Sequence, residues 1–177
     1  MKITITSFLL VAIQLFGQSA DTKEPQTVEK VVLGKYIGKW FEIAKIPNRF
    51  QRNCAKNTTA TYSMNENGMI KVINRCVEED GEIDEAEGVA RITDTLSNAK
   101  LEVSFVSFLG WRPFWGAYWI IGLDENYHWA IVGHPERKYG WILSRTKSIS
   151  KNTKSKIFSI LKSQGYNINE FEMTVQE

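Results

Sequence analysis

Short runs in which apolar and polar residues alternate follow one another from residue 40 to residue 144. Successive side chains of a β-strand point to opposite faces, so this alternation predicts strands with one buried and one solvated face. In one run, polar residues at 100, 102 and 104 alternate with Leu101, Val103 and Phe105, which we expect to face inward. The pattern predicts eight strands in all, at 40–46, 58–64, 69–76, 85–92, 100–105, 117–123, 129–134 and 139–144.

The connections between these runs contain residues that favour tight turns. The segment 65–68 reads Asn-Glu-Asn-Gly, and its Asn-Gly pair accepts the positive φ angles of a hairpin turn. Lys71 in the following run must face water, which directs Ile70 and Val72 inward. Closely spaced strands joined by short turns are typical of an all-β, antiparallel, up-and-down arrangement.

The hydrophobic period changes after the eighth run. Ser150 is placed to cap a helix, Gly165 to end it, and the apolar face would consist of Ile157, Ile160 and Leu161. A last short strand is expected at 171–175. Eight strands followed by one helix predict an eight-stranded antiparallel up-and-down barrel with a C-terminal α-helix. An immunoglobulin-type sandwich, the alternative, would not normally keep such a helix.

The first residues have the order of a secretory signal peptide: a positive charge, an apolar run and then small residues. The apolar run, 3–16, is shorter than the ~20 residues of a spanning helix and is interrupted by polar residues, which argues against a membrane anchor. We expect a signal peptide at 1–19 cleaved after Ser19, a flexible segment at 20–30 and one domain at 31–177. The mature protein should therefore be exported.

Composition removes several classes of function. Net charge is +2, with 22 basic and 20 acidic residues mixed along the chain, so no nucleic-acid partner is expected. The two histidines, His128 and His134, lack a metal-binding spacing, and no catalytic motif is evident, so we expect no metal, cofactor or catalytic residue. The six Trp, six Tyr and nine Phe fit either a dense core or an apolar ligand cavity.

Two cysteines, Cys54 and Cys76, are present. In an exported protein a single pair is most simply a disulfide. The alternative is that Cys54 is a free nucleophile, because Arg52 and Lys56 nearby would favour its thiolate.

The segment between the fifth and sixth predicted strands is unusually aromatic for a loop. Such a surface lowers solubility unless it contacts something. It could cover a cavity mouth, enter a membrane surface, form a homodimer contact or fold back on its own barrel. The residues concerned are Phe108, Leu109, Trp111, Phe114 and Trp115.

Three segments, in order, resemble the signature blocks of the lipocalin family. Gly38-Lys39-Trp40 is similar to the Gly-x-Trp block of the first strand, 123–127 to the second block and 141–146 to the third. Further segments resemble the branch that holds bacterial outer-membrane lipocalins, plant temperature-induced lipocalins and apolipoprotein D; these are 47–51, 60–63, 72–74 and 87–90. Bacterial members are typically anchored through a cysteine after the signal peptide, and this chain has none there.

The resemblance implies a role for several residues. Arg145 would lie across Trp40 and seal one end of the barrel, which is a structural role, and the cysteine pair would match relatives in which these positions form a disulfide. The interior would bind a hydrophobic ligand, although the same residues could fill a solid core. With the strand alternation, the expected ligand-binding residues are Ala60, Tyr62, Ile70, Val72, Val103, Phe105, Tyr118, Ile120, Ala130, Val132, Tyr139 and Trp141.

The resemblance thus implies a non-enzymatic protein that carries or stores a fatty acid, a lysophospholipid or a similar lipid. The alternative from a different class is a lipid-modifying enzyme that uses Cys54 as a cavity thiol. An exported lipocalin would be periplasmic or associated with the outer membrane in a bacterium, and extracellular otherwise.

Overall fold

The structure, a computed structural model, describes residues 23–177, so the expected signal peptide and its cleavage site lie outside the described residues. Regular elements follow one another closely from residue 33 to residue 173. In chain order they are α1 (Leu33–Tyr36), β1 (Gly38–Lys45), η1 (Arg49–Gln51), β2 (Cys54–Met64), β3 (Ile70–Glu78), β4 (Ile83–Ile92), β5 (Lys100–Ser104), β6 (Gly116–Leu123), β7 (Trp129–Gly133), β8 (Gly140–Ser144), α2 (Lys151–Ser163), η2 (Ile168–Glu170) and β9 (Glu172–Met173).

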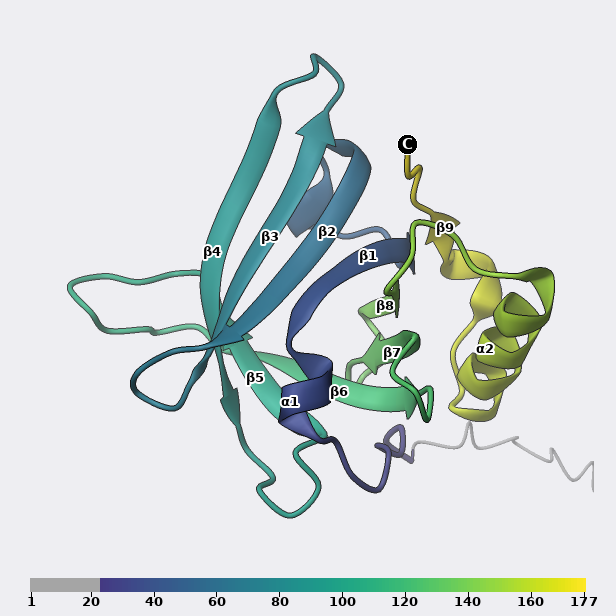
Figure 1. Cartoon of the computed structure of the whole chain (residues 1–177), viewed down its shortest axis with the longest axis horizontal. Helices are drawn as coiled ribbons and strands as arrows, with labels where there is room; N and C mark the ends of the chain where they lie inside the picture. The colour runs from purple at the N-terminus through teal and green to yellow at the C-terminus, as the bar shows by residue number, and fades with distance from the viewer. Residues whose placement is uncertain (1–22) are drawn as a thin grey trace, which may run out of the picture.

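The strands form a closed antiparallel barrel. From β2 to β8 each strand pairs with the next along the chain, and β1 pairs with both β8 and β2. This confirms the predicted eight-stranded up-and-down barrel. The short β9 adds a ninth strand beside β1. Figure 1 shows α2 on one side of the barrel, beside β7 and β8.

Two apolar clusters, one on each side of the barrel wall, form the core. The inner cluster fills the barrel and includes Trp40 and Ile120. The outer cluster joins the wall to α2 through Ile131, Ile157 and Leu161, all fully buried. Because β7 is covered on both faces, every residue in it is buried.

The C-terminal helix has the predicted signals at both ends. The Ser150 hydroxyl accepts a hydrogen bond from the Thr153 N–H (3.1 Å), and Gly165 follows the helix with φ +79°. The predicted strand after it is shorter than expected, since only Glu172–Met173 pairs with β1.

The structure also contains elements that the alternation did not predict. α1 is a single turn, too short to show a helical period, and it lies directly before β1. β2 and β4 begin earlier than expected, at Cys54 and Ile83, because both pair with β3 up to its end. Ser104, expected to face water, is buried, and its hydroxyl donates to the Val106 carbonyl where β5 ends.

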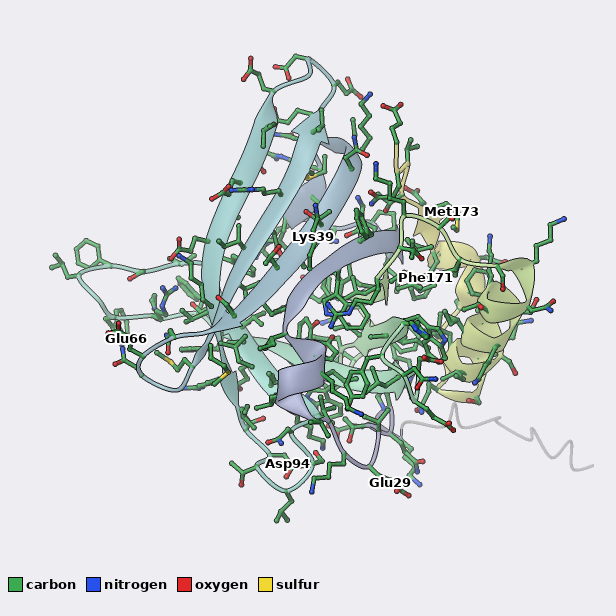
Figure 2. All side chains as sticks on the ribbon, in the orientation of Figure 1. Glu29, Lys39, Glu66, Asp94, Phe171 and Met173 are labelled. Atoms are coloured by element: carbon green, nitrogen blue, oxygen red, sulfur yellow. A yellow bond between two sulfur atoms is a disulfide. The ribbon has the colours of Figure 1, made fainter. Side chains whose placement is uncertain are left out.

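The C-terminal residues close a seam in the barrel wall. β1 and β2 pair over only four residues of β1, at Gly38–Phe41. Beyond them the tail enters between the strands: the Thr174 N–H donates to the Ile43 carbonyl and the Asn57 N–H to the Val175 carbonyl. In Figure 1 this tail runs past the end of β1, and Figure 2 labels Phe171 and Met173 at its base.

The segment before α1, described from residue 23, lies against the barrel without regular structure. The Val28 N–H donates to the Ile120 carbonyl (2.9 Å), and the Gln26 N–H donates to the Gln164 side chain (2.8 Å). Within the described residues, no helix has the length and apolar character needed to cross a membrane.

Candidate functional site

The barrel has a closed end, here called the floor, near α1 and the β2–β3, β4–β5 and β6–β7 turns. Figure 2 labels Glu66 and Asp94 in two of these turns. The opposite end, here called the mouth, carries the β1–β2, β3–β4, β5–β6 and β7–β8 connections. The interior between them is the candidate site.

A tryptophan and an arginine seal the floor. The Trp40 side chain is completely buried, and the Arg145 guanidinium lies 3.7 Å from its ring centroid. That guanidinium also donates to the carbonyls of Lys39 (2.8 Å) and Lys35 (2.7 Å), and the Trp40 indole N–H donates to the Tyr36 carbonyl (2.8 Å). The contact expected between Trp40 and Arg145 is therefore present.

Three tyrosines meet above Trp40. The Tyr118 hydroxyl is 2.8 Å from that of Tyr36 and 2.9 Å from that of Tyr62. Burial raises the pKa of Tyr62 to about 12, and burial raises the pKa of Tyr36 and of Tyr118 well above the usual value of a phenol. The trio is therefore neutral at physiological pH, and its three phenols are the only titratable groups among the described residues that line the space at the floor.

The space next to the tyrosines is small and apolar. Its volume is about 10 Å³, the size of a single water molecule. Five predicted interior residues surround it, namely Tyr62, Ile70, Val103, Tyr118 and Ile120. The other lining residues, Leu33, Tyr36, Ala90 and Leu101, were not among the predicted site residues.

Ten of the twelve predicted interior residues belong to the inner cluster or pack against it. Besides the five that surround the space at the floor, these are Ala60, Val72, Ala130, Val132 and Trp141. The remaining two lie at the rim of the mouth. Phe105 is 40% exposed and its ring lies against Gly88, while the Tyr139 ring stacks on Trp141 with centroids 6.0 Å apart.

A larger hollow of about 460 Å³ lies at the mouth, where η1 connects β1 to β2. Lys45 in its wall pairs with Trp141 across β1 and β8, so the hollow lies on the face of the wall that carries Trp141. Its lining is more polar than that of the floor and consists of Lys45, Pro47, Asn48, Arg49, Gln51, Arg52, Cys54 and Glu172.

Gln51 and Glu42 fix the wall of this hollow. The Gln51 side chain accepts from the Trp141 indole N–H (2.9 Å) and donates to the Glu42 carboxylate (2.6 Å). The same carboxylate accepts from the Thr174 hydroxyl (2.6 Å) and lies 3.4 Å from the Lys45 ammonium. Glu42 is almost fully buried, so its charge is used inside the wall rather than offered to a ligand.

The predicted disulfide is present at the mouth. Cys54 is bonded to Cys76, with Cα atoms 5.5 Å apart and a sequence separation of 22. Neither cysteine is a free thiol, so the cavity nucleophile of the enzyme alternative is absent from this structure. Asp84 lies close to both sulfur atoms, but sulfur in a disulfide does not supply the thiolate ligand that a metal needs.

The aromatic segment between β5 and β6 projects away from the barrel (Figure 1). Phe108 and Trp111 exchange two backbone hydrogen bonds of 2.9 Å around a turn in which Leu109 and Gly110 have positive φ. Leu109 at the tip is 93% exposed. Only Trp115 folds back, under the Arg91 guanidinium at 4.1 Å. We call the exposed Phe108, Leu109, Trp111 and Phe114 the aromatic tip.

Sequence reasoning missed Tyr36, Lys45 and Gln51. Tyr36 belongs to a single helical turn without a period, and its side chain enters the barrel from below rather than from a strand. Lys45 and Gln51 are polar residues in or next to a connection, and alternation alone assigns such residues to the solvent. The alternation did direct Leu101 inward.

Comparison with known proteins agrees with this architecture. Residues 31–176 match the family model described as "Lipocalin-like domain". The chain is 42% identical over 137 residues to the outer membrane lipoprotein Blc of Citrobacter freundii, covering 77% of this chain and 74% of that protein. It is 36% identical over 159 residues to temperature-induced lipocalin-1 of Arabidopsis thaliana, covering 88% and 85%.

More distant proteins share the same fold. Apolipoprotein D of Macaca fascicularis is 34% identical over 159 residues, covering 86% of this chain and 81% of that protein. Among solved structures, insecticyanin from the tobacco hornworm Manduca sexta superposes with a TM-score of 0.68 at 25% identity, covering 86% of this chain and 83% of that one. With a family model that spans the whole described barrel, the chain belongs to the lipocalin family.

Proposed function

We propose that the protein binds and carries one single-chain lipid, such as a fatty acid or a lysophospholipid, with its acyl chain in the barrel. The observation that carries this proposal is the change in the wall along the barrel. The interior next to Trp40 is lined by apolar side chains and neutral tyrosines, the charged side chains of Glu42 and Lys45 lie further toward the mouth, and a hollow of about 460 Å³ lies at the mouth itself. Burying an acyl chain there would contribute ~25 cal/mol per Å² of apolar area.

The chain would enter past the rim rather than fill a ready cavity. The space at the floor is about 10 Å³, whereas the rim residues Phe105, Tyr139 and Trp141 are only partly buried. Rotation of these rings would lengthen the hollow toward the floor. A solid core is the competing account, and it predicts no saturable binding.

Titration with a fluorescent fatty-acid analogue tests the proposal. The parent should bind one equivalent. Gly116→Phe should abolish binding and still fold, because Gly116 lies opposite Val103 on the inner face and the nearest atom to an added Cβ is 3.9 Å away. Ile120→Arg should also abolish binding, because it would place an unpaired cation among buried side chains.

The matched controls use Ile83, which is 69% exposed on the outer face of β4. Ile83→Phe and Ile83→Arg should bind like the parent. Absence of saturable binding by the folded parent, or full binding by folded Gly116→Phe, would refute an open interior.

We further propose that the protein acts outside the cytoplasm. The disulfide suits an oxidising compartment, and a relative with 42% identity is named an outer membrane lipoprotein. In a bacterium this would be the periplasm or the outer membrane, and otherwise the extracellular space. Intact mass of the protein recovered from its native host should show an N-terminus at Ala20; a mass that retains residues 1–19 would contradict the proposed signal cleavage.

The aromatic tip suggests where the lipid is acquired, and we propose that it contacts a membrane surface. Four large apolar side chains beside the mouth are exposed, and aromatic rings are favoured at lipid headgroups. Leu109→Glu should reduce vesicle flotation several-fold, whereas Leu96→Glu, equally exposed at 88% but at the floor, should not. Equal flotation of both variants, or a change in sedimentation mass instead, would favour a homodimer contact over a membrane.

A further inference from the structure

Two arginines in the mouth hollow differ from every other arginine in the described part of the chain. Arg75 and Arg91 pair with carboxylates on the outer wall, and Arg112, Arg137 and Arg145 donate to backbone carbonyls. The guanidiniums of Arg49 and Arg52, by contrast, have no hydrogen-bond acceptor among residues 23–177. Five of the seven described arginines are thus occupied by the fold, and the remaining two line one hollow.

The charge around these arginines is not balanced by the hollow itself. Lys45 is held by the buried Glu42, which leaves Glu172 as the one carboxylate in the lining. Counting Lys45, Arg49 and Arg52 against Glu172 and Glu42, the region carries a net charge of +1. Arg49 also lies over the Phe50 ring at 5.0 Å, which positions its guanidinium without using its hydrogen-bond donors.

The floor cannot hold a negative charge. Among the described residues that line the space there, the only polar side-chain groups are the hydroxyls of Tyr36, Tyr62 and Tyr118, which bind one another and stay neutral. The Arg145 guanidinium is stacked on Trp40 and donates to backbone carbonyls, and Arg145 is not among the residues that line the space. An amphiphile with an anionic end would therefore have its chain toward the floor and its charge at the mouth.

We propose that Arg49 and Arg52 bind the anionic head group, a phosphate or a carboxylate, of the lipid carried in the barrel. This inference rests on the proposed lipid-carrier function and adds the orientation and the head-group class of the ligand. The guanidinium fork matches both oxyanions and donates two parallel hydrogen bonds to each. Asn48 and Gln51 in the same lining are already bonded to each other and to the wall, and Lys45 is paired with Glu42, so the two arginines are the donors of the lining without a partner among the described residues.

The test compares three single-chain lipids with the same acyl chain: a fatty acid, a lysophosphatidic acid and a neutral monoacylglycerol. Each displaces a bound fluorescent probe. The parent should bind at least one anionic lipid about tenfold more tightly than the neutral lipid, as expected for one charge-assisted contact. The double variant Arg49→Gln/Arg52→Gln should lose this preference and keep its affinity for the monoacylglycerol. Which anion is preferred identifies a carboxylate or a phosphate as the head group.

Two variants serve as controls for charge alone. The double variant Lys151→Gln/Lys162→Gln, at exposed positions of α2, removes two positive charges at a remote place and should leave the preference intact. Glu172→Gln removes the opposing carboxylate of the hollow and should strengthen binding of the anionic lipids only.

The outcomes separate this inference from the proposed function. Equal binding of anionic and neutral lipids by the parent, or a preference that survives the double variant, would overturn the head-group site and leave the carrier function standing. Failure of all three lipids to bind would overturn the carrier function itself. If the double variant folds poorly, the parent is measured at several ionic strengths instead. The preference for anionic over neutral lipid must then shrink as ionic strength rises, and a constant preference would overturn the head-group site.

Discussion

The floor and the mouth of this barrel are built from opposite kinds of interaction. At the floor, an aromatic plug, the cation stacked on it and three neutral hydroxyls all have partners within the protein. At the mouth, two guanidiniums and four large apolar side chains have no comparable partner within the part of the chain that the structure describes. A closed set of contacts contributes stability, whereas unsatisfied groups are free to bind something else. Stability and recognition are thus assigned to different ends of one barrel.

The largest expected effect is at the floor. Trp40→Ala should lower the free energy of unfolding by ~3–5 kcal/mol, because it removes a fully buried ring and leaves a cavity. Arg145→Ala should also destabilise, and the losses should not add, because the two side chains are in contact. Denaturant titrations of both variants and the double variant measure this. Trp111→Ala at the mouth, where the ring is 67% exposed, is the matched control and should leave the free energy of unfolding almost unchanged. If the losses of the two floor variants add, Trp40 and Arg145 do not stabilise the floor together.

The next effect is at the mouth. Replacing both Cys54 and Cys76 by serine should lower stability by ~3 kcal/mol, the value expected for a loop closed over this sequence separation. The loss should appear equally in the parent treated with a reductant, and the reduced protein should keep its Trp40 environment, seen by near-ultraviolet circular dichroism. An unchanged midpoint after complete reduction would show that the disulfide does not stabilise the mouth.

A smaller effect is expected at the seam between β1 and β2. The Gln176 amide donates to the carbonyls of Glu42 and Thr58, both at 2.8 Å. Gln176→Ala should lower stability by ~1–2 kcal/mol, because two backbone acceptors lose their donor. Hydrogen exchange of β2 amides near Thr58 should accelerate while amides at the floor do not change. Uniform acceleration would mean that the seam and the floor unfold together.

Much of the barrel followed from the sequence for a simple reason. Alternation reports which side of a wall a residue faces, and turn residues such as Gly68, with φ +74°, report where the chain reverses. Both signals are local. The limit appears at Lys45, an inward-facing cation that alternation would assign to solvent. Its partner Glu42 is only three residues away, but the Thr174 hydroxyl that also binds the Glu42 carboxylate comes from the C-terminal tail, which no local pattern reveals.

The tyrosine trio shows the same limit at the floor. Tyr62 and Tyr118 were expected inside because they lie on strands, but their hydrogen bonds depend on each other and on Tyr36, which comes from the short α1. The aromatic segment was predicted as a loop, and four options were left open for it. Only the structure shows that Trp115 packs under Arg91 while the residues of the aromatic tip stay exposed.

The smallest effect sharpens the comparison through pH. Burial raises the pKa of Tyr62 from 10.0 to about 12, so the unfolded chain loses this proton more readily than the folded one. The stability that Tyr62 contributes is therefore fully present below pH 10 and is lost as pH rises from 10 toward 12, by ~1 kcal/mol at pH 11. The readout is the difference in unfolding free energy between the parent and Tyr62→Phe, since lysines that titrate in the same range cancel. That difference should stay constant up to pH 10 and then shift in favour of the phenylalanine variant. A difference that stays flat to pH 12 would mean that the floor admits water and that its neutrality is not maintained by burial.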